Sequence, residues 1–130
     1  MKFFLDNMIS VKFARALREV ERQVVALRER FAEDTPDRVW LTEIAKESPV
    51  LITLDRHIRS RPLERIALSH AGIISLFLGP FFSKKSFPFW EQFVWLVKHW
   101  TMLEHTAKGL GSGTCMLVTQ SGKMYPMPKS

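Results

Sequence analysis

The chain contains the run Val50-Leu51-Ile52-Thr53-Leu54, in which apolar residues do not alternate with polar ones. A continuous apolar run is typical of a strand that is buried on both faces, as in a parallel sheet. A second run of the same character, residues 73–78, stops at Gly79-Pro80. We therefore expect two strands of a parallel sheet with helices over both of its faces.

Segments on either side extend this pattern into an alternation of strands and helices. Ser10 can cap a helix, Thr35 and Pro36 form a strong helix start, and Pro62 opens another helix. Further strands are predicted at residues 2–5, 23–27, 114–119 and 123–125, and helices at residues 10–20, 36–48, 62–71 and 89–107. Strict alternation predicts a three-layer α/β/α fold with a mostly parallel sheet and right-handed crossovers.

Length and composition favour one ordinary globular domain. The chain has 130 residues, of which 46% are hydrophobic and 25% charged, and a net charge of +6. We expect one domain over residues 1–130, in which residues 108–130 form a glycine-rich break and a hairpin. The single cysteine, Cys115, excludes an intrachain disulfide, and no apolar stretch is long enough to span a bilayer. These features predict a cytoplasmic protein that does not bind membranes.

Three aspartates are placed to meet at one edge of this sheet. Asp6 follows the first strand, Asp55 follows the third, and Asp37 lies in the first turn of the helix after the second. Strand-to-helix loops emerge at the carboxyl edge of a parallel sheet, where ligands bind. Helical spacing turns Asp37 toward the sheet with Leu41 and Ile44. Each aspartate alone could be a turn former or a helix cap, so their shared edge is what indicates a site.

Carboxylates that are held together repel one another, and a divalent cation relieves this repulsion. Oxygen ligands suit magnesium or manganese, and the sequence has no zinc-ligand pattern. Such an ion can hold an attacking water and offset the charge that develops on a phosphate. We therefore expect Asp6, Asp37 and Asp55 to be metal-binding and catalytic residues.

Two segments resemble conserved elements of a known family. Phe3-Phe4-Leu5-Asp6-Asn7 resembles the opening strand and first acidic residue of PIN domains, and residues 51–56 are similar to their strand-Thr-x-Asp element. Asp34-Thr35-Pro36-Asp37, followed by Trp40-Leu41, resembles the short PIN-like toxins related to the VapC ribonucleases. The resemblance is good over residues 1–80 and loose beyond them.

The resemblance implies a magnesium- or manganese-dependent endoribonuclease that cleaves RNA phosphodiester bonds and is held inactive by a cognate antitoxin. It assigns the first acid to Asp6, the strand-end acid to Asp55 and the middle acid to Asp37 or Glu43. Family members often carry a fourth acid one strand later. None follows residues 73–78 here, so Glu64 substitutes or the site has only three acids. The alternative is a catalytically weak or inactive PIN-fold module that binds RNA or a protein partner.

Basic residues are expected around the acidic site. They could attract the RNA backbone toward an otherwise negative pocket, although any one of them could equally be a solvated loop charge. With Asn7, which could position a water or a phosphate, the predicted RNA-binding residues are Arg56, Arg59, Arg61, Lys84 and Lys85.

The longest predicted helix has one main apolar stripe and a separate apolar pair. The stripe consists of Phe89, Phe93, Leu96, Trp100 and Leu103, widened by Trp90, Val94 and Val97, and it is expected to pack on the sheet. Trp95 and Met102 fall outside the stripe, one heptad apart. Aromatic residues and methionine are enriched at interfaces, so this pair predicts a contact with the antitoxin or with a second copy in a homodimer. Alternatively, the C-terminal hairpin covers both side chains.

Overall fold

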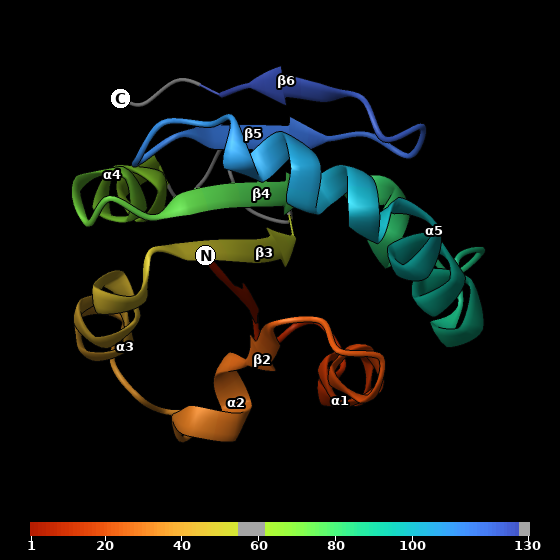
Figure 1. The fold of residues 1–130 in the computed structure, drawn as a ribbon, viewed down its shortest axis with the longest axis horizontal. Coiled ribbons are helices and arrows are strands. Elements are labelled where there is room, and N and C mark those ends of the chain that lie inside the picture. The colour runs from red at the N-terminus through yellow and green to blue at the C-terminus, as the bar shows by residue number, and fades with distance from the viewer. Residues whose placement is uncertain (55–61, 128–130) are drawn as a thin grey trace.

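The structure is a computed structural model, and it describes residues 1–54 and 62–127. Its strands form one sheet in the order β2-β1-β3-β4-β5-β6, and Figure 1 shows this sheet with helices on both sides. The strands are β1 (Lys2–Leu5), β2 (Val24–Ala26), β3 (Pro49–Leu54), β4 (Ile74–Leu78), β5 (Cys115–Val118) and β6 (Met124–Pro126). The helices are α1 (Val11–Glu19), α2 (Leu27–Arg30), α3 (Asp37–Ile44), α4 (Pro62–His70) and α5 (Phe89–Lys108), with short 3-10 turns η1 (Ala45–Glu47) and η2 (Pro80–Ser83).

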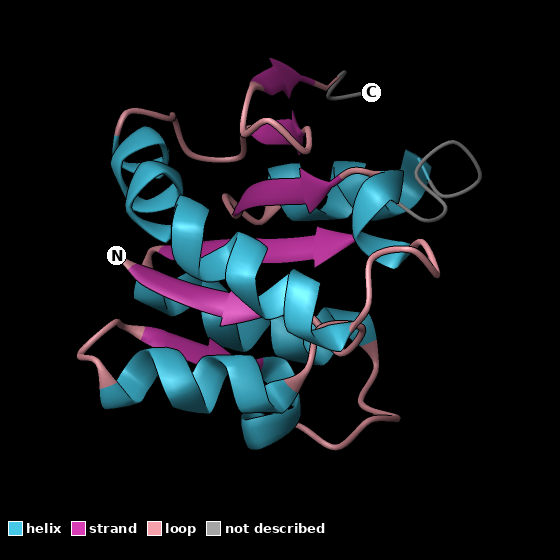
Figure 2. Ribbon diagram, turned by 90° about the vertical axis from the view of Figure 1, so that its right-hand side faces the viewer, coloured by secondary structure: helices cyan, strands magenta, loops and turns pink. Residues whose placement is uncertain are grey.

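The sheet is parallel from β2 to β5, and only β6 runs antiparallel to its neighbour. In Figure 2 the magenta arrows of these parallel strands point to the right, so the carboxyl edge lies on that side. The predicted three-layer α/β/α fold with a mostly parallel sheet is therefore confirmed. No helix in residues 1–54 and 62–127 is long and apolar enough to cross a bilayer.

Alternate residues of the central strands pack into two separate cores, one on each side of the sheet. Phe3 and Leu5 of β1 lie in the core beneath α1 and α5, together with Phe13 of α1. Phe4, between them, points to the opposite face and packs with Ile44 of α3. Because both faces of β1 and β3 are buried, these strands lack the polar alternation of a one-sided sheet.

Two details of the helices differ from the sequence-based expectation. Helix α2 was not predicted; it begins immediately after β2, and Glu29 accepts a hydrogen bond from the Ala26 amide at its start. Helix α3 begins at Asp37, with Pro36 in the capping position, one residue later than expected. Ser10 does cap α1, because its hydroxyl accepts a hydrogen bond from the Lys12 amide.

The predicted interface through Trp95 and Met102 is wrong, because the C-terminal hairpin covers both residues. Trp95 is only 5% exposed, and its indole N–H donates to the Gln120 carbonyl at 2.8 Å. Met102 is half-buried against the same core. The hairpin turns at Gly122, which has a φ of +92°, and a Cβ there would lie 3.1 Å from Met102 Cε. The alternative expectation, that the hairpin covers the pair, is therefore confirmed.

Part of the predicted apolar stripe of α5 does not pack on the sheet. Its buried residues are Trp95, Leu96, Trp100, Leu103 and Ala107. In contrast, Phe89, Trp90, Val94 and Val97 are exposed, which corrects the expectation that all four are core residues. The hairpin covers one flank of the helix, so the buried arc is rotated toward Trp95 and away from Val97.

Candidate functional site

Asp6 lies at the carboxyl end of β1, in the middle of the sheet. The strand that leads to it, Phe3-Phe4-Leu5, is almost completely buried, and Asp6 itself is half-buried. Its backbone amide donates to the Ile52 carbonyl of β3 at 3.0 Å, so the chain is still paired to β3 at this residue. Asp6 is therefore held by the sheet rather than by a free loop.

Both carboxylate oxygens of Asp6 are oriented by hydrogen bonds. Thr53 Oγ1 donates to Asp6 Oδ2 at 2.6 Å, and the Asn7 amide donates to Asp6 Oδ1 at 2.8 Å. Thr53 is on β3 and is only 4% exposed, so its hydroxyl has little freedom to turn away. A carboxylate can accept about four hydrogen bonds or metal contacts, so two positions remain for a ligand.

Asn7 adds a second oxygen donor beside Asp6. Its side-chain Oδ1 is buried and has no hydrogen-bond partner among the residues that the structure describes. A buried polar atom without a partner is costly, and such atoms are found where a ligand, a water or an ion binds. Carboxylate and amide oxygens are the ligands that hard divalent cations prefer, so this pair fits a magnesium or manganese ion.

Arg28 places a positive charge next to the backbone of Asn7, and it was not predicted from the sequence. Its guanidinium Nη2 donates to the Asn7 carbonyl at 3.3 Å and lies 3.6 Å from Glu33 Oε1. Arg28 is on α2, immediately after β2, the strand beside β1. The sequence could have indicated Arg28, because it lies two residues after the end of β2, just as Asp6 follows the end of β1. The basic residues that were predicted all follow β3 or β4, so the segment after β2 was overlooked.

Asp37 does not point toward the sheet as expected. It is exposed at the first position of α3, and its Oδ1 accepts a hydrogen bond from Trp40 Nε1 at 3.1 Å. Trp40 lies one turn along the same helix, so a local partner holds the carboxylate outside the core. The alternative middle acid, Glu43, is also exposed, and it pairs with Lys46 Nζ at 3.3 Å.

Asp55, Arg56, Arg59 and Arg61 lie outside the described residues, as does the side chain of Glu64. Leu5 pairs with Ile52, so Asp6 comes level with Thr53, two residues before Asp55 in the chain. Within the described residues, no group of three or more Asp, Glu, His or Cys side chains could hold a metal ion.

The end of β4 carries no acid. Gly79 follows the strand, its amide donates to the Val118 carbonyl at 2.9 Å, and η2 begins at Pro80. Lys84 and Lys85 come directly after η2, and both are exposed. The two lysines therefore lie in the loop that leaves the carboxyl end of β4.

Comparison with known proteins identifies the N-terminal part of this arrangement. A family model described as a PIN-like domain matches residues 1–80, which include Asp6, Asn7, Arg28, Asp37 and Thr53. PIN-like domains have a nuclease-type fold, which agrees with the parallel sheet and the acidic residue at its carboxyl edge. No curated protein and no solved structure matches the chain.

Proposed function

We propose that this chain, which belongs to the PIN-like domain family, is a magnesium- or manganese-dependent endoribonuclease. Its substrate is the phosphodiester backbone of RNA, and its partner is a cognate antitoxin protein that holds it inactive. The proposal makes the chain the toxin of a toxin–antitoxin pair related to the VapC ribonucleases.

The observation that carries this proposal is the fixed carboxylate of Asp6. Thr53 and the Asn7 amide hold its two oxygens in place, and Asn7 Oδ1 beside it has no partner within the described part of the chain. This arrangement costs stability if the site binds nothing. Preorganised oxygen donors of this kind are what a divalent cation needs in a catalytic site.

Asp6 and Asn7 would hold the ion together with Asp55 and Asp37. When bound, a divalent ion activates water for attack and offsets the charge that builds up on the phosphate. Thr53 keeps the Asp6 carboxylate in one orientation, so that no reorganisation is needed when the ion and the substrate arrive. Asp37 would have to turn away from Trp40 to reach the ion.

Basic residues near this edge would hold the RNA backbone. Arg28 is fixed on the Asn7 carbonyl, and Lys84 and Lys85 are exposed in the loop after β4. Lysine and arginine bind phosphates independently of the base sequence. Arg56, Arg59 and Arg61 would extend the same surface from the segment after β3.

A second candidate is an inactive module of the same fold that binds RNA or a protein partner. The observation that favours it is the end of β4, where Gly79-Pro80 stands in place of a fourth acid. Binding without cleavage would need the basic residues but not the carboxylates.

The test is cleavage of single-stranded RNA by the purified chain, with and without Mn²⁺ or Mg²⁺. We expect metal-dependent cleavage that Asp6→Asn reduces more than about 100-fold, since even the residues that orient metal ligands contribute 10- to 100-fold. Asp34→Asn, an exposed aspartate in the loop before α3, is the matched control and should cleave normally. RNA binding without cleavage by the wild-type chain under all metal conditions would favour the inactive module.

A further inference from the structure

The first turn of α5 exposes two aromatic side chains to solvent. Phe89 is 52% exposed and Trp90 is 68% exposed, although both side chains are large and apolar. Single exposed apolar residues are common on protein surfaces and need no function. What these two residues do therefore depends on how they are held and on which groups lie beside them.

The core holds both exposed rings in place. The ring of Phe89 lies 4.8 Å from that of Phe13 on α1, which is only 1% exposed. The half-buried ring of Phe93 lies 5.4 Å from Phe13 and 6.3 Å from Trp90, so it links the second exposed ring to the same buried residue. Tilted aromatic pairs at these separations attract one another. Both exposed rings are thus supported from the inside and lose little side-chain freedom when a ligand binds.

The exposed pair lies at the carboxyl edge of the sheet, as Asp6 does. Helix α5 follows β4 through η2 and a short loop, so its first turn is at this edge, from which Figure 2 shows it crossing the sheet. Helix α1 is capped by Ser10, and the amide of Ile9 before it donates to the Asp6 carbonyl at 2.9 Å. Phe13 is three residues beyond Ser10, which is about 5 Å along the helix axis. The ring that supports Phe89 is therefore within one helical turn of the segment that carries Asp6.

Three exposed lysines lie in the segments that carry or adjoin the exposed rings. Lys84 and Lys85 lie in a turn that a backbone hydrogen bond of 2.9 Å closes shortly before α5, and Lys12 is in the first turn of α1. None of the three is in an ion pair with a residue that the structure describes. Glu91, the acid in the first turn of α5, lies about 200° from Phe89 around the helix. The charge beside the exposed rings is therefore mainly positive.

We propose that Phe89 and Trp90 form a stacking site for unpaired bases of RNA, whose phosphates the three lysines hold. The inference rests on the proposed function, because it names the form of RNA that the same edge of the sheet takes. Proteins bind single-stranded nucleic acid by combining a positively charged surface with aromatic rings on which bases stack. In a duplex the bases stack on one another, so their faces are not available to a protein ring. The site therefore selects single-stranded RNA without selecting a base sequence.

The lysines beside the rings favour RNA over a protein as the ligand of this surface. A protein that covered Phe89 and Trp90 would also take the neighbouring ammonium groups out of water, which is costly unless each of them meets an acid. RNA supplies a phosphate for each lysine and a base for each ring at the same time.

Binding of a labelled single-stranded RNA, measured by fluorescence anisotropy without divalent ions so that no cleavage occurs, tests the stacking. We expect Trp90→Ala to weaken binding about 5- to 100-fold, which is the range for the loss of one base–aromatic stack. Trp90→Phe keeps an aromatic ring and should retain most of the affinity. The matched control is Tyr125→Ala, which removes a 52% exposed ring from the hairpin and should bind RNA normally. All three residue changes are at exposed positions, and thermal unfolding will verify that the variants are folded.

Two further probes separate stacking from phosphate binding. Stacking releases no counterions, so the slope of log affinity against log salt should be the same for Trp90→Ala as for the wild type. A ribose-phosphate oligomer of the same length that has no bases should bind Trp90→Ala and the wild type equally. An RNA that carries the fluorescent base 2-aminopurine should be quenched on binding the wild type and much less on binding Trp90→Ala.

The outcomes distinguish this inference from the proposed function. If the wild type binds single-stranded RNA and Trp90→Ala binds it equally well, the stacking site is wrong and RNA remains the ligand. Equal weakening of the base-free oligomer by Trp90→Ala would also overturn the stacking site. A wild-type chain that binds no RNA at any salt concentration would overturn both the stacking site and the proposed function. Loss of a protein contact, but not of RNA binding, in Trp90→Ala would assign this surface to a protein partner instead. Stacking without metal-dependent cleavage would support the site and reject the nuclease activity.

Discussion

Thr53 Oγ1 donates a hydrogen bond of 2.6 Å to Oδ2 of Asp6, although the two residues are 47 positions apart in the chain. The parallel pairing of β1 with β3 brings them level at the carboxyl edge. One buried hydroxyl therefore fixes the carboxylate on which the proposed metal site depends.

Removing this hydroxyl should weaken metal binding without unfolding the protein. Thr53→Val keeps the shape of the side chain and leaves Asp6 without its buried donor, so we expect the affinity for Mn²⁺ to fall about 10- to 100-fold. Isothermal titration measures the affinity. Thr53→Ser keeps the hydroxyl and should retain most of the binding. Thr42→Val, which removes an exposed hydroxyl that donates to the Arg38 carbonyl of the same helix, is the control. Equal binding by Thr53→Val and the wild type would mean that the Thr53 hydroxyl does not hold the Asp6 carboxylate for metal binding.

The middle acid of the site can be identified by comparing two residues of α3. Asp37 is at the start of the helix, and Glu43 is six residues later and paired with Lys46. Strand β3 follows α3 and η1 and begins at the amino edge of the sheet, so the start of α3 is the end nearer the carboxyl edge. We expect Asp37→Asn to reduce RNA cleavage at least about tenfold and Glu43→Gln to have little effect. The opposite order in a cleavage assay would assign the middle acid to Glu43.

The basic residues should bind the RNA backbone without reading the bases. Replacing Lys84 and Lys85 with glutamine removes two exposed charges, so the slope of log affinity against log salt should become shallower by about one unit for each phosphate that is no longer bound. Arg28→Gln should have a similar effect. The control, Lys108→Gln with Lys123→Gln, removes the same charge from the end of α5 and the hairpin. Filter binding to several RNA sequences at different salt concentrations measures the effect. A loss of binding for only one sequence would contradict backbone binding.

The sheet could be predicted from the sequence because its central strands are continuous apolar runs, which few structures other than a doubly covered parallel sheet can bury. Residues 50–54 and 73–78 must be buried on both faces, and their order along the chain implies parallel pairing. The position of Asp6 followed from the end of β1. Its bond to Thr53 did not, because strand register depends on tertiary packing rather than on local pattern.

The surfaces of α5 could not be predicted in the same way. Its apolar residues surround most of the helix, so periodicity alone cannot say which of them the sheet covers and which the hairpin covers. Trp95 is buried because residues 25 positions away fold over it and accept its N–H. Asp37 was misplaced because Trp40, a partner within the same helix, competes with the sheet for its carboxylate.

The last prediction concerns how two salt bridges in the N-terminal half of the fold affect its stability in acid. Arg18 binds Glu29 through two hydrogen bonds, of 2.8 and 2.6 Å, and thereby ties α1 to α2. These bonds lower the pKa of Glu29 below its ordinary value, and Arg30 lowers the pKa of Glu47 in the same way.

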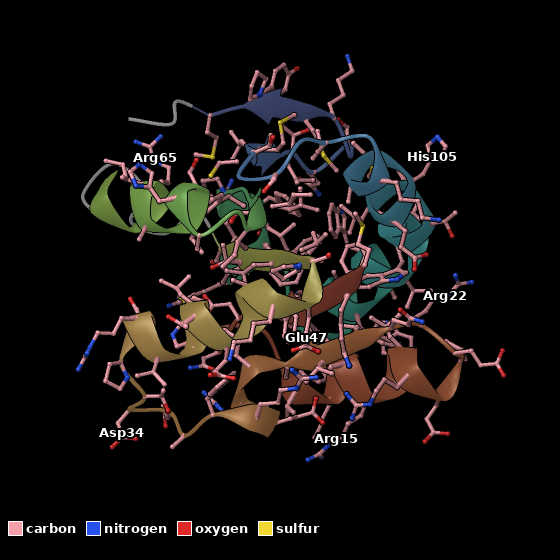
Figure 3. The ribbon with its side chains drawn as sticks, turned by 60° about the vertical axis from the view of Figure 1, so that its left-hand side comes forward. Arg15, Arg22, Asp34, Glu47, Arg65 and His105 are labelled. Atoms are coloured by element: carbon pink, nitrogen blue, oxygen red, sulfur yellow. The ribbon has the colours of Figure 1, made fainter. Side chains whose placement is uncertain are left out.

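A lowered pKa in the folded state means that the unfolded chain binds protons more readily as the pH falls. The stabilisation is therefore complete above the ordinary glutamate pKa of about 4.3 and is lost as the pH falls below it. We expect Glu29→Gln to lower the unfolding free energy at neutral pH and to make its decrease between about pH 5 and pH 3 less steep than in the wild type. Asp34→Asn, at an exposed carboxylate with no ion pair in the described part of the chain and visible at the lower left of Figure 3, should leave the steepness unchanged. Urea unfolding at a series of pH values measures the unfolding free energy of the wild type and of both variants. If Glu29→Gln and the wild type lose stability equally in acid, the bridge between α1 and α2 does not contribute to the folded state, because its protonation would then have no cost.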